Sequence, residues 1–252
     1  MNIASKCRHP HLLQFISATN DEGNPLFVTE LMEKSLRTLL EQRQLSETEI
    51  AVICLDVALA LNYLHQKKPE PIIHRDISSA NVLLWRQGDQ WRGKVSDYGT
   101  ANFMHQTMTV ALGAMIYSAP EALTSKQTVK VSFRLFLAAY SPRIIFIFAL
   151  NSAHRFSYLR AFVPPNGTQC LSATVIFLLI SANSVDVYSF GALLCEMCIR
   201  QLPDPQRRNE QVVLVTNGVF RGLVRRCLQR EPGARPTMQE IIDELKDFDP
   251  TS

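Results

Sequence analysis

The most regular pattern of apolar and polar positions in the chain lies in "SETEIAVICLDVALALNYLHQ", residues 46–66. Its apolar residues recur at spacings of three and four, which is the period of one face of an α-helix. They are Ile50, Ile53, Val57, Ala60, Leu61 and Leu64. Ser46 precedes this apolar run, and Glu49 lies three residues after Ser46. This arrangement is typical of the capping box at the start of a helix. The pattern predicts a helix with one buried face.

Shorter apolar runs on both sides of this segment predict strands. "HLLQFISA" and "PLFVTEL" are separated by the turn-rich "TNDEGN", which indicates an antiparallel hairpin. A second pair of strands is expected in "NVLLWRQGDQWRGKVSDYG", residues 81–99, around a turn that contains glycine. From Val185 onward the pattern is mostly helical. The last helix is predicted in "TMQEIIDELKDF", where Thr237 is the cap and Glu240 completes a second capping box.

Residues 131–184 differ in composition from the rest of the chain. They contain four arginines, seven of the 13 phenylalanines and no Lys, Asp or Glu. Their apolar runs, "IIFIFAL" and "LSATVIFLLISA", are shorter than the ~18–20 residues of a membrane-spanning helix. Because long insertions are uncommon in compact domains, we expect a foreign apolar insertion, such as a translated intron, whose deletion improves folding. The alternative is a membrane-associated protein anchored through this block, which requires the block to be genuine coding sequence.

Composition and charge narrow the classes of function. An apolar content of 46% over 252 residues supports a substantial core. The net charge of +3 includes no run of Lys or Arg of the kind that binds nucleic acid, so we expect no nucleic-acid partner. The N-terminus has no apolar signal-peptide segment, and the six cysteines, without paired metal-ligand spacing, are typical of reduced intracellular thiols. We therefore expect a cytoplasmic protein, and we interpret the C-x-x-C of Cys195 and Cys198 as apolar positions in a buried helix.

Two polar clusters carry the candidate chemistry. "HRDISSAN", residues 74–81, resembles the catalytic loop of eukaryotic protein kinases, and "DYG", residues 97–99, resembles their metal-binding Asp-Phe-Gly. "SAPE", residues 118–121, is similar to their Ala-Pro-Glu segment, and the three motifs follow in the family's order. "LFVTELMEKSL" is similar to the kinase hinge, and "DVYSFGALLCEM" and "REPGARPTMQEI" are similar to helices of the C-lobe. The resemblance covers everything except the block 131–184.

The resemblance implies an α+β protein kinase-like fold, mostly the helical C-lobe with remnants of the N-lobe sheet. The partial kinase domain would comprise residues 1–130 and 185–248, with the N-lobe remnant at 1–32, the C-lobe from residue 33 and a tail at 249–252. Kinases place a Gly-rich loop, a strand lysine and a helix glutamate ahead of the hinge, and the chain has no match to these three features. We therefore expect the chain to begin at an internal methionine.

The resemblance assigns catalytic and binding roles by position. Asp76 would accept the proton of the substrate hydroxyl. Asn81 and Asp97 would hold magnesium, since oxygen donors suit a hard cation. The residues expected to contact ATP, in the hinge and on the floor of the pocket, are Thr29, Glu30, Met32 and Leu83.

Other residues would have structural roles by the same resemblance. Those expected to connect the lobes or face the activation segment are His74, Tyr98 and Arg75. Asp186 would brace the catalytic loop from the helix below it. Glu121 would pair with Arg235, and leaving either buried charge alone would cost ~3–5 kcal/mol.

The implied function is transfer of the γ-phosphate of ATP to a hydroxyl of a protein substrate, with ATP and magnesium as cofactors. Ser78 and Ala114 replace the lysine and threonine of many serine/threonine kinases, while Tyr117 stands where tyrosine kinases usually have tryptophan. The chain is thus similar to the tyrosine-kinase-like group, which favours Ser/Thr hydroxyls and leaves Tyr open. Because the three upstream features have no match, we expect impaired transfer. The alternative is a non-catalytic kinase-like module that binds or scaffolds partners.

Overall fold

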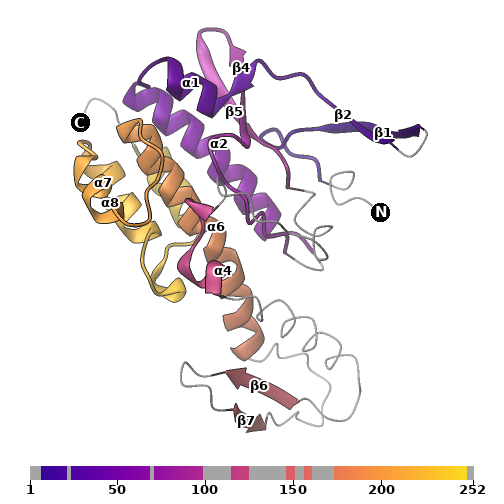
Figure 1. Ribbon diagram of the computed structural model, residues 1–252, viewed down its shortest axis with the longest axis vertical. Helices are drawn as coiled ribbons and strands as arrows, with labels where there is room; N and C mark the ends of the chain where they lie inside the picture. Colours follow the sequence, from indigo (N-terminus) through magenta and orange to yellow (C-terminus); the bar gives the residue numbers. More distant parts are fainter. Residues whose placement is uncertain are drawn as a thin grey trace. The chain divides into compact units, whose positions relative to one another are not determined.

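The computed structural model of the protein describes residues 7–21, 24–68, 71–98, 115–124, 146–150, 156–160 and 173–248. In chain order, its elements are β1 (Phe15–Asp21), β2 (Asn24–Thr29), β3 (Lys34–Ser35), α1 (Leu36–Gln42), α2 (Glu47–His65), β4 (Val82–Gln87), β5 (Gln90–Val95), α4 (Pro120–Thr124), β6 (Phe146–Leu150), β7 (Phe156–Arg160), α6 (Ala173–Ile199), α7 (Arg208–Leu214), α8 (Gly218–Cys227), the short 3₁₀ helix η2 (Pro232–Ala234) and α9 (Met238–Lys246) (Figure 1). They form two compact units. The first contains Met1–Ala119 and Ile180–Ser252, and the second contains Pro120–Leu179.

Helix α2 is the helix predicted for residues 46–66, and the prediction is confirmed. Glu49 N donates to Ser46 Oγ at 3.2 Å, and Ser46 N donates to Glu49 Oε2 at 2.9 Å. The predicted apolar face is buried and packs against β5 and α9. In the described part of the chain, α2 is the one helix long and apolar enough to cross a membrane, a property that core helices share. A second capping box, between Thr237 and Glu240, begins α9 as predicted.

Both predicted hairpins are present. Strands β1 and β2 pair antiparallel as a two-stranded sheet, and β4 pairs antiparallel with β5. The short strand β3 joins the other edge of β4, which gives the order β3-β4-β5. Gly88 in the β4–β5 turn has a φ of +63°, a conformation that glycine adopts without steric cost. The buried side chains of this sheet share one apolar core with α2.

Helix α6 forms the centre of the helical part of the first unit. Most of its side chains from Val187 to Met197 are buried. Gly191 allows α8 to approach closely, because a Cβ at this position would lie 2.5 Å from Cys227 Cβ. Cys195 is buried and Cys198 is half-buried on this helix, as interpreted from the sequence. Burial raises the pKa of Cys195 to about 11 and that of Cys198 to about 12, so both thiols stay protonated at neutral pH.

The second unit overlaps most of the block 131–184 and contains the antiparallel strands β6 and β7. Helix α6 begins at Ala173 and therefore crosses the boundary expected at Val185. The change in composition does not end the helix, because no Gly or Pro interrupts residues 173–190. The foreign origin of the block stays a prediction.

Candidate active site

The loop between α2 and β4 brings two predicted site residues into direct contact. Asn81 Nδ2 donates to the main-chain oxygen of Asp76 at 2.8 Å and to Asp76 Oδ2 at 2.9 Å. The carboxylate of Asp76 is half-buried. Because Asn81 uses its amide nitrogen for these bonds, its amide oxygen is left to serve as an acceptor or a metal ligand.

Asp97 is held close to this pair through its neighbour. Ser96 N donates to Asn81 O at 2.8 Å, and Ser96 Oγ donates to the same oxygen at 3.0 Å. The next residue, Asp97, has an exposed side chain. These two hydrogen bonds from Ser96 therefore hold Asp97 beside the loop that carries Asp76 and Asn81.

Strained backbone conformations occur at this site. Arg75 has a φ of 66° and Asp97 a φ of 60°, and Arg200 is the only other described non-glycine residue with a positive φ. Such conformations cost about 1–3 kcal/mol each and persist where the surrounding structure enforces them, often at active sites. The strain therefore marks the residues on either side of the candidate catalytic centre.

Asp186 of α6 enforces the conformation at Arg75. Its Oδ2 accepts from His74 N and its Oδ1 from Arg75 N, both at 2.8 Å, and His65 Nε2 lies 2.8 Å from Oδ2. The side chain is fully buried. Burial opposes ionisation of this carboxyl, but its hydrogen bond to His65 and nearby positive charge outweigh burial, so the pKa of Asp186 is lowered. The ionised carboxylate holds the start of the loop.

Glu196 of α6 holds the same loop further along. Ser79 Oγ donates to Glu196 Oε1 at 2.8 Å, and Tyr117 Oη donates to Glu196 Oε2 at 2.5 Å. Arg37 Nε donates to Ser79 Oγ at 2.9 Å, and Arg37 Nη2 donates to Tyr117 Oη at 2.8 Å. Burial raises the pKa of Glu196, and the hydrogen bonds from Tyr117 and Ser79 offset only part of this effect. We call these four residues the Glu196 network.

The residues expected to connect the lobes are buried and hydrogen-bonded. His74 Nε2 lies 2.7 Å from Ser96 O, and Tyr98 Oη donates to Leu13 O at 2.8 Å. Burial raises the pKa of Tyr98 to about 12. Both side chains therefore tie the Asp97 segment to its surroundings, whereas stacking of His74 on Tyr98 and the orientation of the Arg75 side chain stay predictions.

Arg235 is tied to main-chain carbonyl groups. Its guanidinium donates to the carbonyl oxygens of Gln229 at 2.8 Å, Ser184 at 2.9 Å and Arg230 at 3.2 Å. The predicted pairing of Arg235 with Glu121 stays a prediction.

The residues expected to contact ATP lie at the end of β2 and on β4. Thr29 is exposed and donates to Glu30 O at 3.2 Å, while Met32 and Leu83 are half-buried. The side chain of Glu30 pairs with Lys94, with Nζ at 2.6 Å from Oε2 and 2.7 Å from Oε1. Lys94 was not identified from the sequence, and this pair fixes the end of β2 against β5.

The oxygen atoms of Asn81 and Asp97 fit magnesium as ligands. In the described part of the chain, no group of three or more His, Cys, Asp or Glu residues could hold a metal ion. A site would thus depend on Asn81 and Asp97, which suits magnesium because this ion usually keeps several water ligands and binds through few protein oxygens and substrate phosphates.

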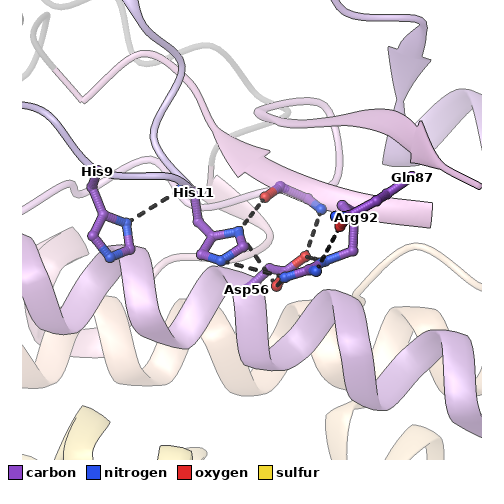
Figure 2. Close-up of polar contacts among 6 residues, drawn as sticks. His9, His11, Asp56, Gln87 and Arg92 are labelled. Atoms are coloured by element: carbon purple, nitrogen blue, oxygen red, sulfur yellow. Dashed lines mark hydrogen bonds and ion pairs between the residues drawn. The ribbon is translucent and has the colours of Figure 1, made fainter. Parts of the chain in front are cut away.

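A second buried polar cluster lies under β5. Asp56 of α2 accepts from Gly93 N at 2.8 Å and from Arg92 Nε at 2.9 Å and Nη2 at 2.7 Å, and His11 Nδ1 lies 3.3 Å from its Oδ1. Figure 2 shows these side chains converging on Asp56, with His9 beside His11. The cluster ties the 9–11 segment and β5 to α2, so we assign it a structural role.

Sequence reasoning missed both Glu196 and Asp56 as organising residues. Each is a lone acidic residue in an apolar helical run, "GALLCEMCI" and "IAVICLDVALALNYL". A charge in a buried helix face needs partners, and this signal could have identified both. Their partners come from distant segments, which the pattern of one helix does not reveal.

Residues 1–139 match the model of the protein kinase domain, and this match ends inside the block 131–184. The chain belongs to the protein kinase domain family. It is 32% identical to serine/threonine-protein kinase 12 of Arabidopsis thaliana over 97% of the chain and 46% of that relative. It is 26% identical to the dual specificity protein kinase shkC of Dictyostelium discoideum over 97% of the chain and 42% of that relative. The chain therefore spans less than half the length of these curated relatives.

The family membership confirms the expected α+β protein kinase-like fold. Family members generally use ATP and magnesium, and the residues that would hold them here remain those predicted from the motifs. One of these relatives is named as a serine/threonine-protein kinase and the other as a dual specificity protein kinase.

Proposed function

We propose that this chain carries the catalytic residues of a protein kinase, which transfers the γ-phosphate of ATP to a hydroxyl group of a protein substrate. Asp76 accepts the hydroxyl proton, and the oxygens of Asn81 and Asp97 hold magnesium. The bound ion would neutralise charge on the phosphates. The bond between Asn81 and Asp76 orients the base toward the incoming hydroxyl.

The observation that carries this proposal is the contact between Asp76 and Asn81, on a loop anchored at two points by α6. Phosphoryl transfer depends on positioning and electrostatic stabilisation far more than on covalent chemistry. A loop held by the buried carboxyls of Asp186 and Glu196 supplies such positioning. We propose ATP and magnesium as cofactors and a protein as substrate.

The test compares Asp76→Asn and Asp97→Asn with the unmodified chain, whose own transfer is expected to be slow because it has no match to the Gly-rich loop, the strand lysine and the helix glutamate. Calorimetry measures binding of ATP with magnesium, and radiolabelled ATP measures transfer to a generic protein substrate. Asp76→Asn is expected to abolish transfer and leave ATP affinity nearly unchanged, because Asp76 faces the acceptor. Asp97→Asn is expected to weaken magnesium-dependent ATP binding as well.

The matched control is Asp89→Asn, which makes the same chemical change in the exposed β4–β5 turn. An equal loss of ATP affinity in the Asp76 and Asp97 variants would contradict the assigned roles. Undetectable transfer and undetectable ATP binding by the unmodified chain would favour the non-catalytic binding module.

We further propose Ser/Thr as the preferred acceptor. Ser78, two residues after Asp76, replaces the lysine of many serine/threonine kinases, but Tyr117 stands where tyrosine kinases usually have tryptophan and is hydrogen-bonded to Glu196. Analysis of the phosphorylated residues in the transfer product tests this preference, and phosphotyrosine as the main product would overturn it.

A further inference from the structure

A hollow of about 460 Å³ lies between α7 and the end of α8, away from the residues assigned to phosphoryl transfer. Three arginines line it, Arg208, Arg225 and Arg230, and no carboxylate does. A second hollow of about 500 Å³ is lined by both arginines and glutamates, including Arg37 and Glu196. Only the first of these two hollows therefore has an uncompensated positive charge.

The arginines of this α7–α8 groove differ from the arginines just outside it. Arg207 pairs with Glu210 at 2.8 Å, and Arg226 pairs with Glu244. Arg225 and Arg230 are exposed, and neither side chain makes an ion pair or hydrogen bond within the described part of the chain. Arg225 and Arg230 therefore line the groove without an ion-pair partner in the described part of the chain, whereas the neighbouring Arg207 and Arg226 each have one.

Arg208 adds buried donors at the same place. Its Nη2 donates to Ile116 O at 2.7 Å, whereas Nε and Nη1 are buried and have no hydrogen-bond partner. Its guanidinium lies 5.5 Å from the ring of Tyr188, and that of Arg235 lies 4.9 Å from the same ring. Buried donors without acceptors are unfavourable, so Arg208 contributes both positive charge and unsatisfied N–H donors beside this groove.

The remaining lining of the groove consists of two amide side chains, Asn209 and Gln229, and three aliphatic ones. Val212, Val213 and Leu228 line it, and Val213 is 65% exposed. Leu214, the next residue on α7, is 52% exposed. A ligand that satisfies the whole surface needs negative charge for the arginines and an apolar side chain for α7.

We propose that the α7–α8 groove binds an acidic segment of a partner protein. Carboxylates of that segment pair with Arg225 and Arg230, where the guanidinium geometry allows two parallel hydrogen bonds to one carboxylate. An aliphatic side chain of the segment covers Val213 and Leu228. This proposal does not depend on phosphoryl transfer.

The experiment measures fluorescence anisotropy of a labelled peptide in which two leucines are flanked by glutamates. The full chain is compared with Arg225→Gln combined with Arg230→Gln, and binding is repeated at higher salt. Since one exposed charge pair changes affinity by roughly 2- to 5-fold, the double variant is expected to bind at least about 5-fold more weakly. Higher salt is expected to weaken binding to the unmodified chain.

The matched control is Arg207→Gln, which removes the same charge next to the groove without altering its lining, and is expected to bind like the unmodified chain. A peptide with serines in place of the leucines is expected to bind more weakly. Equal loss in the Arg207 variant, equal binding of the serine peptide, or no peptide binding would overturn the proposal. Binding of the chain to anionic lipid vesicles without binding to the peptide would overturn it in favour of a membrane surface.

Both substituted arginines are exposed, so the variants are expected to fold. Circular dichroism of each variant checks this directly. If the double variant were unfolded, competition by free glutamate-rich peptide against labelled peptide on the unmodified chain would still decide whether a specific acidic site exists.

Discussion

Asp186 and Glu196 lie on the same helix and hold the same loop, but the chemistry differs between these two regions of α6. The carboxylate of Asp186 accepts hydrogen bonds from two main-chain N–H groups and contacts a histidine ring. The carboxylate of Glu196 accepts hydrogen bonds from two hydroxyl groups, to which Arg37 in turn donates. Both carboxyls are buried, and yet the pKa of Asp186 is lowered and that of Glu196 is raised.

The difference indicates that the donors around a buried carboxyl, together with burial, set the direction of its pKa shift. Main-chain N–H groups and an imidazole favour the ionised form of Asp186. Hydroxyl groups favour ionisation less strongly, so burial prevails at Glu196. We therefore expect Asp186 to act as an ionic anchor of the loop and Glu196 to act as a less strongly stabilising contact that joins Ser79 to Tyr117.

The largest expected effect is at Asp186. Asp186→Ala leaves His65 and the N–H groups of the loop without an acceptor, and removing one partner of a buried charged pair costs about 3–5 kcal/mol of unfolding free energy. Urea denaturation measures the change. Glu244→Ala, which breaks an exposed pair, is the control and is expected to cost about 0–1 kcal/mol. If the Asp186 variant lost no more unfolding free energy than the Glu244 variant, Asp186 would not be a stabilising anchor of the loop.

A smaller effect is expected from the helix between the two acids. Gly191→Ala places a methyl group 2.5 Å from Cys227 Cβ, and overpacking of this kind costs about 1–3 kcal/mol. Gly222→Ala on α8 is the control, because its Cβ would meet only Arg226 Nη1, at 3.7 Å. The unfolding free energy of the Gly222 variant is expected to rise by about 0.5–1 kcal/mol, because alanine has a higher helix propensity than glycine. Thermal unfolding of both variants checks the opposite signs, and a stabilised Gly191 variant would show that α6 and α8 are not closely packed.

The Glu196 region is expected to be weaker than Asp186 when one of its donors is removed. Tyr117→Phe deletes the hydroxyl that bonds Glu196 Oε2, and losing one donor to a buried acceptor costs about 1–3 kcal/mol. Tyr63→Phe, whose hydroxyl makes an exposed contact with Arg8, is expected to cost less. Urea denaturation of the pair measures the difference, and equal costs would mean that the short bond to Glu196 contributes nothing to stability.

The smallest and most specific effect is the dependence of stability on pH. The pKa of Asp186 is below its ordinary value of 3.8, so its contribution is present above that pH and is lost as the pH falls through the lowered pKa. The pKa of Glu196 is above 4.5, so its contribution is present below that pH and declines as the pH rises through the raised pKa.

Unfolding free energies measured in urea across the acidic and neutral range test these signs. Asp186→Asn is expected to flatten the loss of stability at low pH, and Glu196→Gln is expected to remove the decline above 4.5. The same sign of change in both variants would contradict the opposite pKa shifts of the two carboxyls.

Much of the fold could be predicted because its signals are local. The capping boxes at Ser46 and Thr237, the glycine of the β4–β5 turn and the spacing of apolar residues all act within one element. The beginning of α6 was less evident, because the change in composition near Val185 occurs inside the helical stretch 173–190, which contains no proline or glycine.

The motifs of the candidate site were also evident in the sequence, and Asp76, Asn81 and Asp97 were named from them. What holds them was only partly evident. Asp186 was expected to brace the loop, whereas Ser79, Tyr117, Arg37 and Glu196 were not expected to form one network. Nothing near these positions in the sequence indicates that they share hydrogen bonds.

The sequence by itself determined the two hairpins β1–β2 and β4–β5, the two helices that begin with capping boxes and the order of the kinase motifs, since these depend on neighbouring residues and their spacing. Only the tertiary structure decided the partners of the buried acids. Ser79 and Glu196 are 117 positions apart, and Arg37 and Tyr117 are 80 positions apart. Contacts over such separations arise when packed elements bring distant polar groups into a space without water, where each must find a partner.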